Sequence, residues 1–537
     1  MSDDTAFRPT RRATLAAFGG AAAALHLPRS FAEPAQDIAR GVVFEDRSCS
    51  GQRRRGDPGL AGVMLSNGRD VVLTDDDGRW SLPLARGDSA FVIKPPHWST
   101  GPAAGIPSFS YRRGADNVPL PASIDFPLHR QPEPSRFEAL LFADTQAATA
   151  AELDYVHRDL MRSATGCNAA FALHHGDVMG DDLSLLAPYR NILAQTGLTW
   201  HHCPGNHDLD LDAGNPDLGF ESWKRHIGPT HYAFQYAGAV VFLLNNVEFL
   251  GCHGAAPDGR RYQGCFGSRQ LAFVENVLRH VPDDALVVVS MHIPLVSFDA
   301  PSSVSDTTAD RRELLRILAR RPHTISFAGH SHTSEHHELG RAHGFEREAP
   351  HRHQVLTAAS GSWWSGPPDA DGLPIADSRD GSPRGYHVLS VDGASAATRF
   401  VPLSSRAPGQ MRAMLQSRDA PGRVRRGPLP RAALANMALL VNAFDGGPET
   451  RVTFEVAGRD SPPAEMSPTT TLDPHIVESY ARDRALCKPW VAAAPSSHIW
   501  SAPLPPDLAI GAHEIVVRVT GEYGAQHDAR LTIEVVA

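Results

Sequence analysis

The stretch Pro204-Gly205-Asn206-His207-Asp208 follows an apolar run, Leu198-Thr199-Trp200, that has the pattern of a short buried strand. Pro-Gly ends this run abruptly. Asn206, His207 and Asp208 therefore fall on a loop past the carboxyl end of a strand, where open α/β sheets bind ligands. An amide oxygen, an imidazole and a carboxylate side by side suit a hard or borderline metal ion. Tight turns also favour Asn, Asp and Gly for backbone reasons, so the stretch alone leaves a plain turn equally open.

The sequence around this stretch alternates between short apolar runs and amphipathic segments. This alternation is typical of a layered α/β domain. It predicts strands at 139–143, 170–174, 198–202, 240–245, 286–291, 324–328 and 354–358. It predicts helices at 151–163, 185–195, 269–280 and 310–320, and a closing hairpin at 386–402.

Metal-binding side chains follow five of these predicted strands, each at the strand end. They occur in Phe142-Ala143-Asp144-Thr145-Gln146, His175-Gly176-Asp177, Asn206-His207-Asp208, Met291-His292 and Gly329-His330-Ser331-His332. Five strand ends thus deliver carboxylates, an amide and imidazoles to one edge. Mixed carboxylate and imidazole ligation suits manganese, iron or zinc.

The order D-x-x, G-D, G-N-H-D, H, G-H-x-H resembles the calcineurin-like metallophosphoesterase family over residues 136–405, about half of the chain. The resemblance implies a centre of two divalent metal ions bridged by Asp177. Asp144 and His332 would hold one ion, and Asn206, His292 and His330 the other. It also implies that a metal-bridging hydroxide attacks the phosphoester, with His207 as general acid.

The sequence departs from the family pattern at two positions. The first motif is usually D-x-H, and here Gln146 stands in place of the histidine. A Gln oxygen is a weaker and harder ligand, which favours manganese or magnesium over zinc, with iron as a further alternative. Gly180, followed by Asp181, occupies the position of an acidic residue or Tyr, which disfavours a purple acid phosphatase. The carboxylate that orients His207 is either Asp181 or Asp208.

Other aromatic and histidine positions leave a choice between function and packing. Trp363 and Trp364 lie in a Gly/Pro/Asp-rich loop, 361–385, and either bind substrate or anchor the core. We expect His174, His175, His201 and His202 to support the ligands or pack beside them. We expect His336, His337, His351 and His353 to lie at the surface.

Two β-rich regions flank the metallophosphoesterase-like domain. Residues 40–130 carry short β-branched runs separated by Asn-Gly and Asp-Gly turns, and resemble a carboxypeptidase-regulatory-like sandwich. Residues 404–432 are rich in Arg, Pro and Ser and read as a linker. Residues 433–537 alternate with period two, as in an immunoglobulin-like or fibronectin-like sandwich. The predicted fold is multidomain, with a central domain, a β-sandwich flanked by helices, between two all-β sandwiches.

The N-terminus predicts export. Thr10-Arg11-Arg12 resembles a twin-arginine motif, the apolar region that follows is too short for a transmembrane span, and 30–32 resembles a cleavage site. Residues 1–32 thus read as a signal peptide for a periplasmic or extracellular protein. The two flanking regions resemble the N- and C-terminal modules of an exported bacterial branch of the family.

The net charge of −9 and a pI near 6.3 argue against a nucleic-acid surface. Cys252 and Cys265 flank a polar loop and either form a disulfide or stay free.

Two hypotheses for function follow. The first is an exported phosphoesterase acting on a phosphorylated small molecule or polymer. The alternative is a non-catalytic surface or binding protein with a degenerate metal site, whose β modules contact an envelope polymer; Gln146 and the two sandwiches motivate it. Metal content distinguishes them, because a binuclear enzyme should load about two divalent ions per chain.

Overall fold

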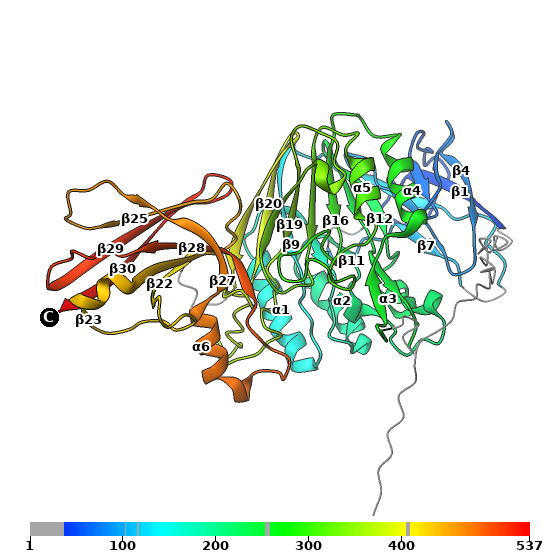
Figure 1. Cartoon of the computed structure of the whole chain (residues 1–537). Coiled ribbons are helices and arrows are strands. Elements are labelled where there is room, and N and C mark those ends of the chain that lie inside the picture. The colour runs from blue at the N-terminus through cyan, green and yellow to red at the C-terminus, as the bar shows by residue number, and fades with distance from the viewer. Residues whose placement is uncertain (1–36, 102–103, 115–117, 253–257, 404–408) are drawn as a thin grey trace, which may run out of the picture.

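A computed structural model describes residues 37–101, 104–114, 118–252, 258–403 and 409–537. The chain is multidomain and mostly β with some helices, as predicted. A central layered region separates two smaller β modules, which lie at opposite ends of the molecule (Figure 1). The predicted signal segment, 1–32, lies outside the described residues. Across the described ranges, no helix combines the length and the apolar content needed to cross a bilayer.

The first sheet of the central region has the strand order β11-β10-β9-β20-β21. Strands β9, β10 and β11 are parallel, and β20 runs antiparallel to β9 and forms the predicted closing hairpin with β21. Apolar runs, 139–142 in β9 and 169–173 in β10, specify two of the parallel strands, because a parallel sheet is covered on both faces. The bounds are β9 (Arg136–Phe142), β10 (Ala169–His175), β11 (Trp200–Cys203), β20 (Gly385–Asp392) and β21 (Ser395–Pro402).

The second sheet has the order β12-β13-β16-β17-β19-β18 and packs face to face with the first. Every residue of β16 is buried, as its Leu-Val-Val-Val-Ser sequence predicts. The bounds are β12 (Tyr232–Tyr236), β13 (Ala239–Leu243), β16 (Leu286–Ser290), β17 (Thr324–Ala328), β18 (Glu335–Leu339) and β19 (His351–Val355). A separate two-stranded ribbon pairs β14 (Val247–Phe249) with β15 (Tyr262–Gly264).

Helices cover the outer faces of these two sheets (Figure 1). Apolar residues of α1 (Ala150–Ala164), α2 (Leu186–Gln195) and α3 (Glu221–His226) share one core with the outer face of the first sheet. Apolar residues of α4 (Gly267–Leu278) and α5 (Arg311–Leu318) join the core that includes the second sheet. Short 3₁₀ turns fall at Leu183–Leu185, Asn206–Asp208, Pro216–Leu218, Arg341–His343, Arg431–Asn436 and Arg484–Leu486.

The N-terminal module consists of two four-stranded sheets, β4-β1-β8-β6 and β3-β2-β5-β7. Phe91 of this module packs edge-on against Phe273 of α4, with ring centroids 5.8 Å apart, so the module shares its core with the central region. The strands are β1 (Asp37–Glu45), β2 (Met64–Ser66), β3 (Val71–Leu73), β4 (Arg79–Leu84), β5 (Ser89–Ile93), β6 (Trp98–Ser99), β7 (Ser110–Arg112) and β8 (Phe126–Arg130).

The C-terminal module pairs the sheets β22-β24-β28-β27 and β23-β30-β29-β25-β26. It contains one helix that the alternation did not predict, α6 (Pro474–Arg482), capped by Asp473 and inserted between β27 and β28. The strands are β22 (Met411–Ser417), β23 (Leu429–Pro430), β24 (Met437–Ala443), β25 (Arg451–Val456), β26 (Ala464–Glu465), β27 (Ser467–Leu472), β28 (Pro495–Pro503), β29 (Gly511–Thr520) and β30 (Gln526–Val536).

Two expectations from the sequence are corrected here, and one open alternative is decided. The predicted linker 404–432 is wrong over 411–417 and 429–430, because β22 pairs along β24 and β23 pairs with β30. The linker was predicted from the Arg, Pro and Ser content of the whole segment, which gave no weight to the apolar residues of Met411-Arg-Ala-Met-Leu415. The four histidines expected at the surface lie in β18 and β19: His336, His351 and His353 are buried, and the side chain of His337 is only 8% exposed. Their rings bond to polar neighbours, His336 to Asp445, His337 to Glu335, His351 to Thr324 and Ser326, and His353 to Ser326. Cys252 and Cys265 are both free thiols.

Candidate metal centre

The loops that follow five parallel strands meet at one edge of the two packed sheets. Strands β9, β10 and β11 belong to the first sheet, and β16 and β17 to the second. Because neighbouring parallel strands end at the same edge, their loops converge there. These loops carry Asp144, Asp177, Asn206, His292 and His330, as the sequence predicts.

A cavity of about 190 Å³ opens at this edge. Asp144 and His292 are fully buried and contact residues of its lining rather than line it. The described residues that line the cavity are Gln146, Asp177, Asn206, His207, Tyr262, Ser297, Asp299, Ala300, Asp306, His330, Ser331, His332, Trp363 and Arg379. Seven of the residues predicted to bind metal, to act on substrate or to contact it therefore line this cavity together with groups from distant loops.

The backbone at this edge is strained in a way that is typical of functional sites. Six non-glycine residues here have left-handed backbone conformation, with φ between 38° and 76°: Asp144, Gln146, Asp177, Asp181, His330 and His332. Gly205 lies so close to Asp177 that a Cβ atom would sit 2.1 Å from its Oδ1. Because Gly205 has no side chain, the Asp177 carboxylate of the neighbouring loop can pack against its backbone.

The Nε2 atom of His292 lies at the centre of the first group of ligand atoms. Its Nδ1 donates to the carbonyl of His175 at 2.8 Å, which leaves Nε2 with a lone pair in the neutral ring. Asn206 Oδ1, His330 Nδ1 and Asp177 Oδ1 lie 3.0, 3.1 and 3.3 Å from Nε2. Ligands held about 2.0–2.2 Å from one ion lie at about this spacing from each other. The four atoms fit the coordination sphere of a single cation.

The predicted ligands of the second ion are Asp144, Gln146 and His332, and one of them contacts the other oxygen of Asp177. Gln146 Nε2 donates to Asp177 Oδ2 at 2.7 Å, and His332 Nε2 lies 3.7 Å from Asp144 Oδ1. Asp144 also accepts the backbone N–H of His330. Asp177 thus contacts one predicted ligand of each group, His292 through Oδ1 and Gln146 through Oδ2.

Buried polar atoms without partners support a fit to metal ions. Gln146 Oε1 and His332 Nε2 are buried and form no hydrogen bond with any described residue. Such unsatisfied atoms are costly in a folded protein unless a ligand completes them. The His332 ring is held by a hydrogen bond from Nδ1 to the carbonyl of Gly361, which frees its Nε2 for coordination. Oxygen and nitrogen atoms in this number suit divalent ions such as manganese, iron, zinc or magnesium.

The carboxylates and imidazoles of the centre shift each other's pKa values. Burial raises the pKa of Asp144 to about 7, with His292 opposing and Asp177 adding to the shift. Burial also opposes ionisation of Asp177, but His292 and His207 outweigh it and hold its pKa well below the usual range. Burial lowers the pKa of His292, yet Asp177 and Asp144 raise it to about 9. The carboxylates that raise the pKa of His292 would also attract a divalent cation to this position.

His207 differs from the other predicted residues because its side chain is about one-third exposed, at 36%. Its Nδ1 lies 2.8 Å from Asp181 Oδ1, and its backbone N–H donates to Asp177 Oδ1. Burial lowers the pKa of His207, but Asp177 and Asp181 outweigh this and raise it to about 9. The ring is therefore held at the cavity wall beside carboxylates that favour its protonated form.

The choice between Asp181 and Asp208 as the partner of His207 is decided by geometry. Asp181 makes the contact with the ring. Asp208 is fully buried and accepts the backbone N–H groups of Val178, Met179 and Gly205 at 2.9–3.1 Å. Asp208 thus ties the loop of Asp177 to the loop of Asn206, which fixes the spacing of two predicted ligands.

The two adjacent tryptophans have different roles. Trp363 lines the cavity and stacks on His332, with ring centroids 3.9 Å apart. Trp364 is buried in the core beside α1, and its indole N–H donates to the carbonyl of Thr145. The expectation that Trp364 contacts substrate is therefore corrected: it anchors the loop that presents Trp363.

Sequence reasoning missed several cavity residues, of which Arg379, Asp299, Asp306 and Tyr262 carry charged or reactive groups. Arg379 lies in the long 361–385 loop, and Asp306 in the loop between β16 and α5. Neither position directly follows a strand end, so no local pattern marked them. Of the histidines beside the ligands, His174 contacts Thr145 and His202 contacts Tyr189, as expected for supporting groups.

Comparison with known proteins gives one family match. Residues 353–527 match the family model described as the C terminal of Calcineurin-like phosphoesterase. None of the curated proteins matches the chain. Among solved structures, a purple acid phosphatase, PPD1, from yellow lupin (Lupinus luteus) seeds is similar at 13% identity and a TM-score of 0.36, over 64% of this chain and 68% of that one. The family match, which runs from β19 through most of the C-terminal module, confirms the predicted resemblance to the calcineurin-like metallophosphoesterase family.

Proposed function

We propose that this protein hydrolyses phosphoester bonds at the cavity formed by the five strand-end loops. The observation that carries the proposal is the convergence of Asn206, His330 and Asp177 on His292 Nε2 at 3.0–3.3 Å, with unsatisfied atoms of Gln146 and His332 beside them. Asp144, Asp177, Gln146 and His332 would hold one divalent ion, and Asp177, Asn206, His292 and His330 the other. When bound, two such ions supply Lewis acidity and lower the pKa of water.

We assign proton transfer to His207. Its ring is partly exposed at the cavity wall and oriented by Asp181, so it can meet a substrate that enters from solvent. A protonated imidazole stabilises negative charge and donates its proton to the leaving oxygen. Trp363 offers an aromatic surface beside these groups and would contact the substrate.

The test is a substrate screen on the purified full-length chain. Phosphomonoesters, phosphodiesters and nucleotides are assayed with and without added manganese, and metal content is measured on the same sample. We expect hydrolysis that depends on a divalent ion, about two ions per chain and loss of activity on chelation. A chain that binds no metal and hydrolyses no phosphoester would instead support a non-catalytic surface or binding protein.

Gln146 provides the first prediction. Its buried Oε1 has no partner among the described residues, so we assign it to a metal ion as a neutral oxygen ligand. Gln146→His supplies the imidazole usual in the family and should lower the manganese concentration that gives half-maximal activity. Gln146→Ala should raise it. Manganese titrations of the three proteins check this, and coincident midpoints would exclude the ligand role.

We also propose that the protein is exported after removal of residues 1–32, to the periplasm or beyond the cell, where an envelope polymer could contact its β modules. The twin-arginine pair supports this proposal. Changing Arg11→Lys together with Arg12→Lys should leave the protein inside the cell. Fractionation of cells that express the two forms measures this, and normal export of the double variant would refute a twin-arginine signal.

A further inference from the structure

Arg379 is the one arginine or lysine among the described residues that line the metal-centre cavity. Its Nη1 donates to Asp299 Oδ2 at 2.8 Å and to the carbonyl of Ser331 at 3.1 Å. Within the described ranges, no group accepts a hydrogen bond from its Nη2. About a quarter of the side chain is exposed. The guanidinium is thus held in place but keeps donor groups free for a ligand.

The C-terminal module holds Arg379 from the opposite side. Arg379 Nε donates to the carbonyl of Ala492 at 3.3 Å, and the Ala494 N–H donates to the carbonyl of Arg379 at 2.9 Å. Both alanines lie in the segment 487–494, which connects α6 to β28. Trp490 of the same segment meets Trp363 of the cavity wall edge-on, with ring centroids 6.4 Å apart. One segment of the C-terminal module therefore contacts two residues of the cavity wall.

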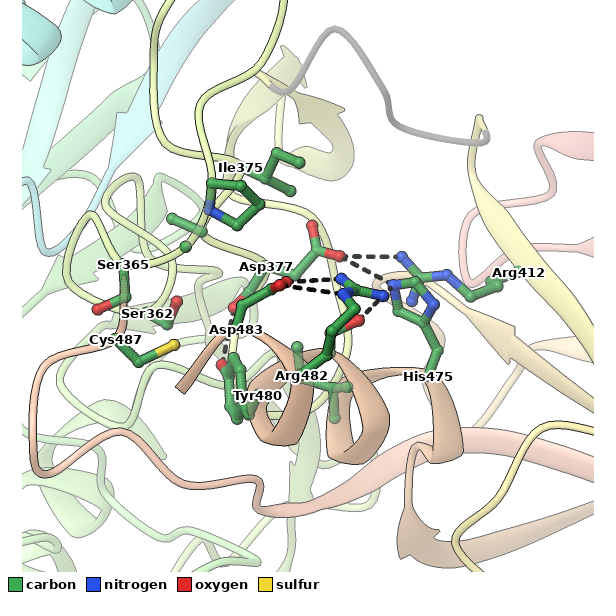
Figure 2. A pocket seen from close by; sticks show the side chains of 15 residues that line it. Ser362, Ser365, Ile375, Asp377, Arg412, His475, Tyr480, Arg482, Asp483 and Cys487 are labelled. Atoms are coloured by element: carbon green, nitrogen blue, oxygen red, sulfur yellow. Dashed lines mark hydrogen bonds and ion pairs between the residues drawn. The ribbon is translucent and has the colours of Figure 1, made fainter. Parts of the chain in front are cut away.

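This contact belongs to a broader docking of the module on the 361–385 loop. Dashed lines in Figure 2 join Asp377 of the loop to Arg412 and to His475. Arg412 Nη2 and His475 Nε2 lie 3.2 and 3.4 Å from Asp377 Oδ2, and the Tyr480 O–H of α6 donates to the Asp377 carbonyl at 2.8 Å. The backbone N–H of Gly366 also donates to the carbonyl of Leu486. Since the loop is fixed at several points by the module, the position of Arg379 depends on both parts of the chain.

The remaining charges of the cavity wall identify the group that Arg379 would bind. Asp177, Asp299 and Asp306 make the lining acidic, so a phosphate needs cations on more than one side. Metal ions at the strand-end loops would contact it from one side, and a planar guanidinium matches the spacing of phosphate oxygens. We propose that Arg379 binds non-bridging oxygens of the substrate phosphoryl group, and that residues 487–494 of the C-terminal module hold it in the cavity. This inference rests on the proposed phosphoester hydrolysis.

The test uses the full chain loaded with manganese and measures binding of inorganic phosphate by calorimetry, together with kcat/KM for the best phosphoester. A hydrogen-bonded charge pair accounts for about 10- to 100-fold in affinity, so Arg379→Ala should lose about this much in both quantities. Metal content should not change, because Arg379 is not placed among the ligands. Arg379→Lys should recover only part of the loss, since an ammonium lacks the planar fork. Arg482→Ala is the matched control, because Arg482 lies on α6 outside the cavity.

The role of the module is tested with a double-mutant cycle. Ala494→Pro removes the N–H that bonds to the Arg379 carbonyl, and it should weaken phosphate binding in the wild type but not in the Arg379→Ala background. If Ala494→Pro does not fold, Ala492→Gly with Ala493→Gly loosens the same segment and replaces it. Equal losses in both backgrounds would overturn the claim that the module acts through Arg379.

The two proposals fail in different ways. If the wild type hydrolyses phosphoesters and Arg379→Ala binds phosphate equally well, the inference is wrong and the proposed function stands. If no phosphoester is hydrolysed but phosphate binding depends on Arg379, the proposed function is wrong and the binding role stands. A loss of metal together with a fall in melting temperature in Arg379→Ala would mean that the residue is only structural.

Discussion

Asp177→Asn is expected to abolish phosphoester hydrolysis and to lower metal content sharply. Asp177 contacts a member of each group of candidate ligands, His292 through Oδ1 and Gln146 through Oδ2. An asparagine keeps the shape and can still accept the His207 N–H, but it removes a full negative charge between two cations. We expect a rate at least about 10³-fold lower, beyond the loss from removing a single stabilising donor.

The measurement is kcat with metal analysis of the same purified protein. Asp212→Asn is the matched control, because it makes the same chemical change on an exposed loop of the central region. The control should retain wild-type metal content and rate. Unchanged turnover and metal stoichiometry in Asp177→Asn would contradict the binuclear assignment.

His207→Ala is expected to keep both metal ions and to lose about 10²–10⁴-fold in rate. The ring lies at the cavity wall beside Asp181 and is not part of either group of ligand atoms, so its removal should leave the metal sites intact. The loss should shrink for substrates with good leaving groups, because these need less protonation. A series of aryl phosphates with graded leaving groups measures this dependence.

Asp181→Asn provides a second variant for the same role. It keeps a hydrogen-bond acceptor beside His207 Nδ1 but removes the charge that helps to keep the ring protonated. We expect a smaller loss than for His207→Ala and the same trend with leaving group. Equal losses across the whole series in both variants would mean that His207 positions substrate and transfers no proton.

Much of the central fold could be predicted because hydrophobic pattern and burial agree there. The apolar runs at 139–143, 286–291 and 324–328 correspond to β9, β16 and β17, whose residues are almost all buried. The amphipathic segment at 151–163 corresponds to α1. The pattern fails where polar residues occupy buried strand positions. β19 begins with the buried His351 and also contains the buried His353, so the strand was predicted at 354–358 instead of His351–Val355 and both histidines were expected at the surface.

The site could be predicted in part for a related reason. Parallel strands of one sheet end at the same edge, so metal-binding residues at successive strand ends can be expected to lie close together from the sequence alone. Spacing along the chain did not distinguish Asp181 from Asp208, because both lie near His207 and only side-chain direction separates them. In the same way, two adjacent tryptophans looked equivalent in sequence, although one faces the cavity and the other the core.

By itself, then, the sequence determined the layered central region, the order of the strand-end motifs and the resemblance to the calcineurin-like family, since these depend on local pattern and on how parallel strands end. Only the tertiary structure decided that Asp208 ties two loops together, that residues 411–417 form a strand, and that Arg379 enters the cavity held by the C-terminal module. Each of these depends on contacts between residues far apart in the chain. Such contacts leave no periodic signal in sequence, because they are set by the packing of one loop or module against another.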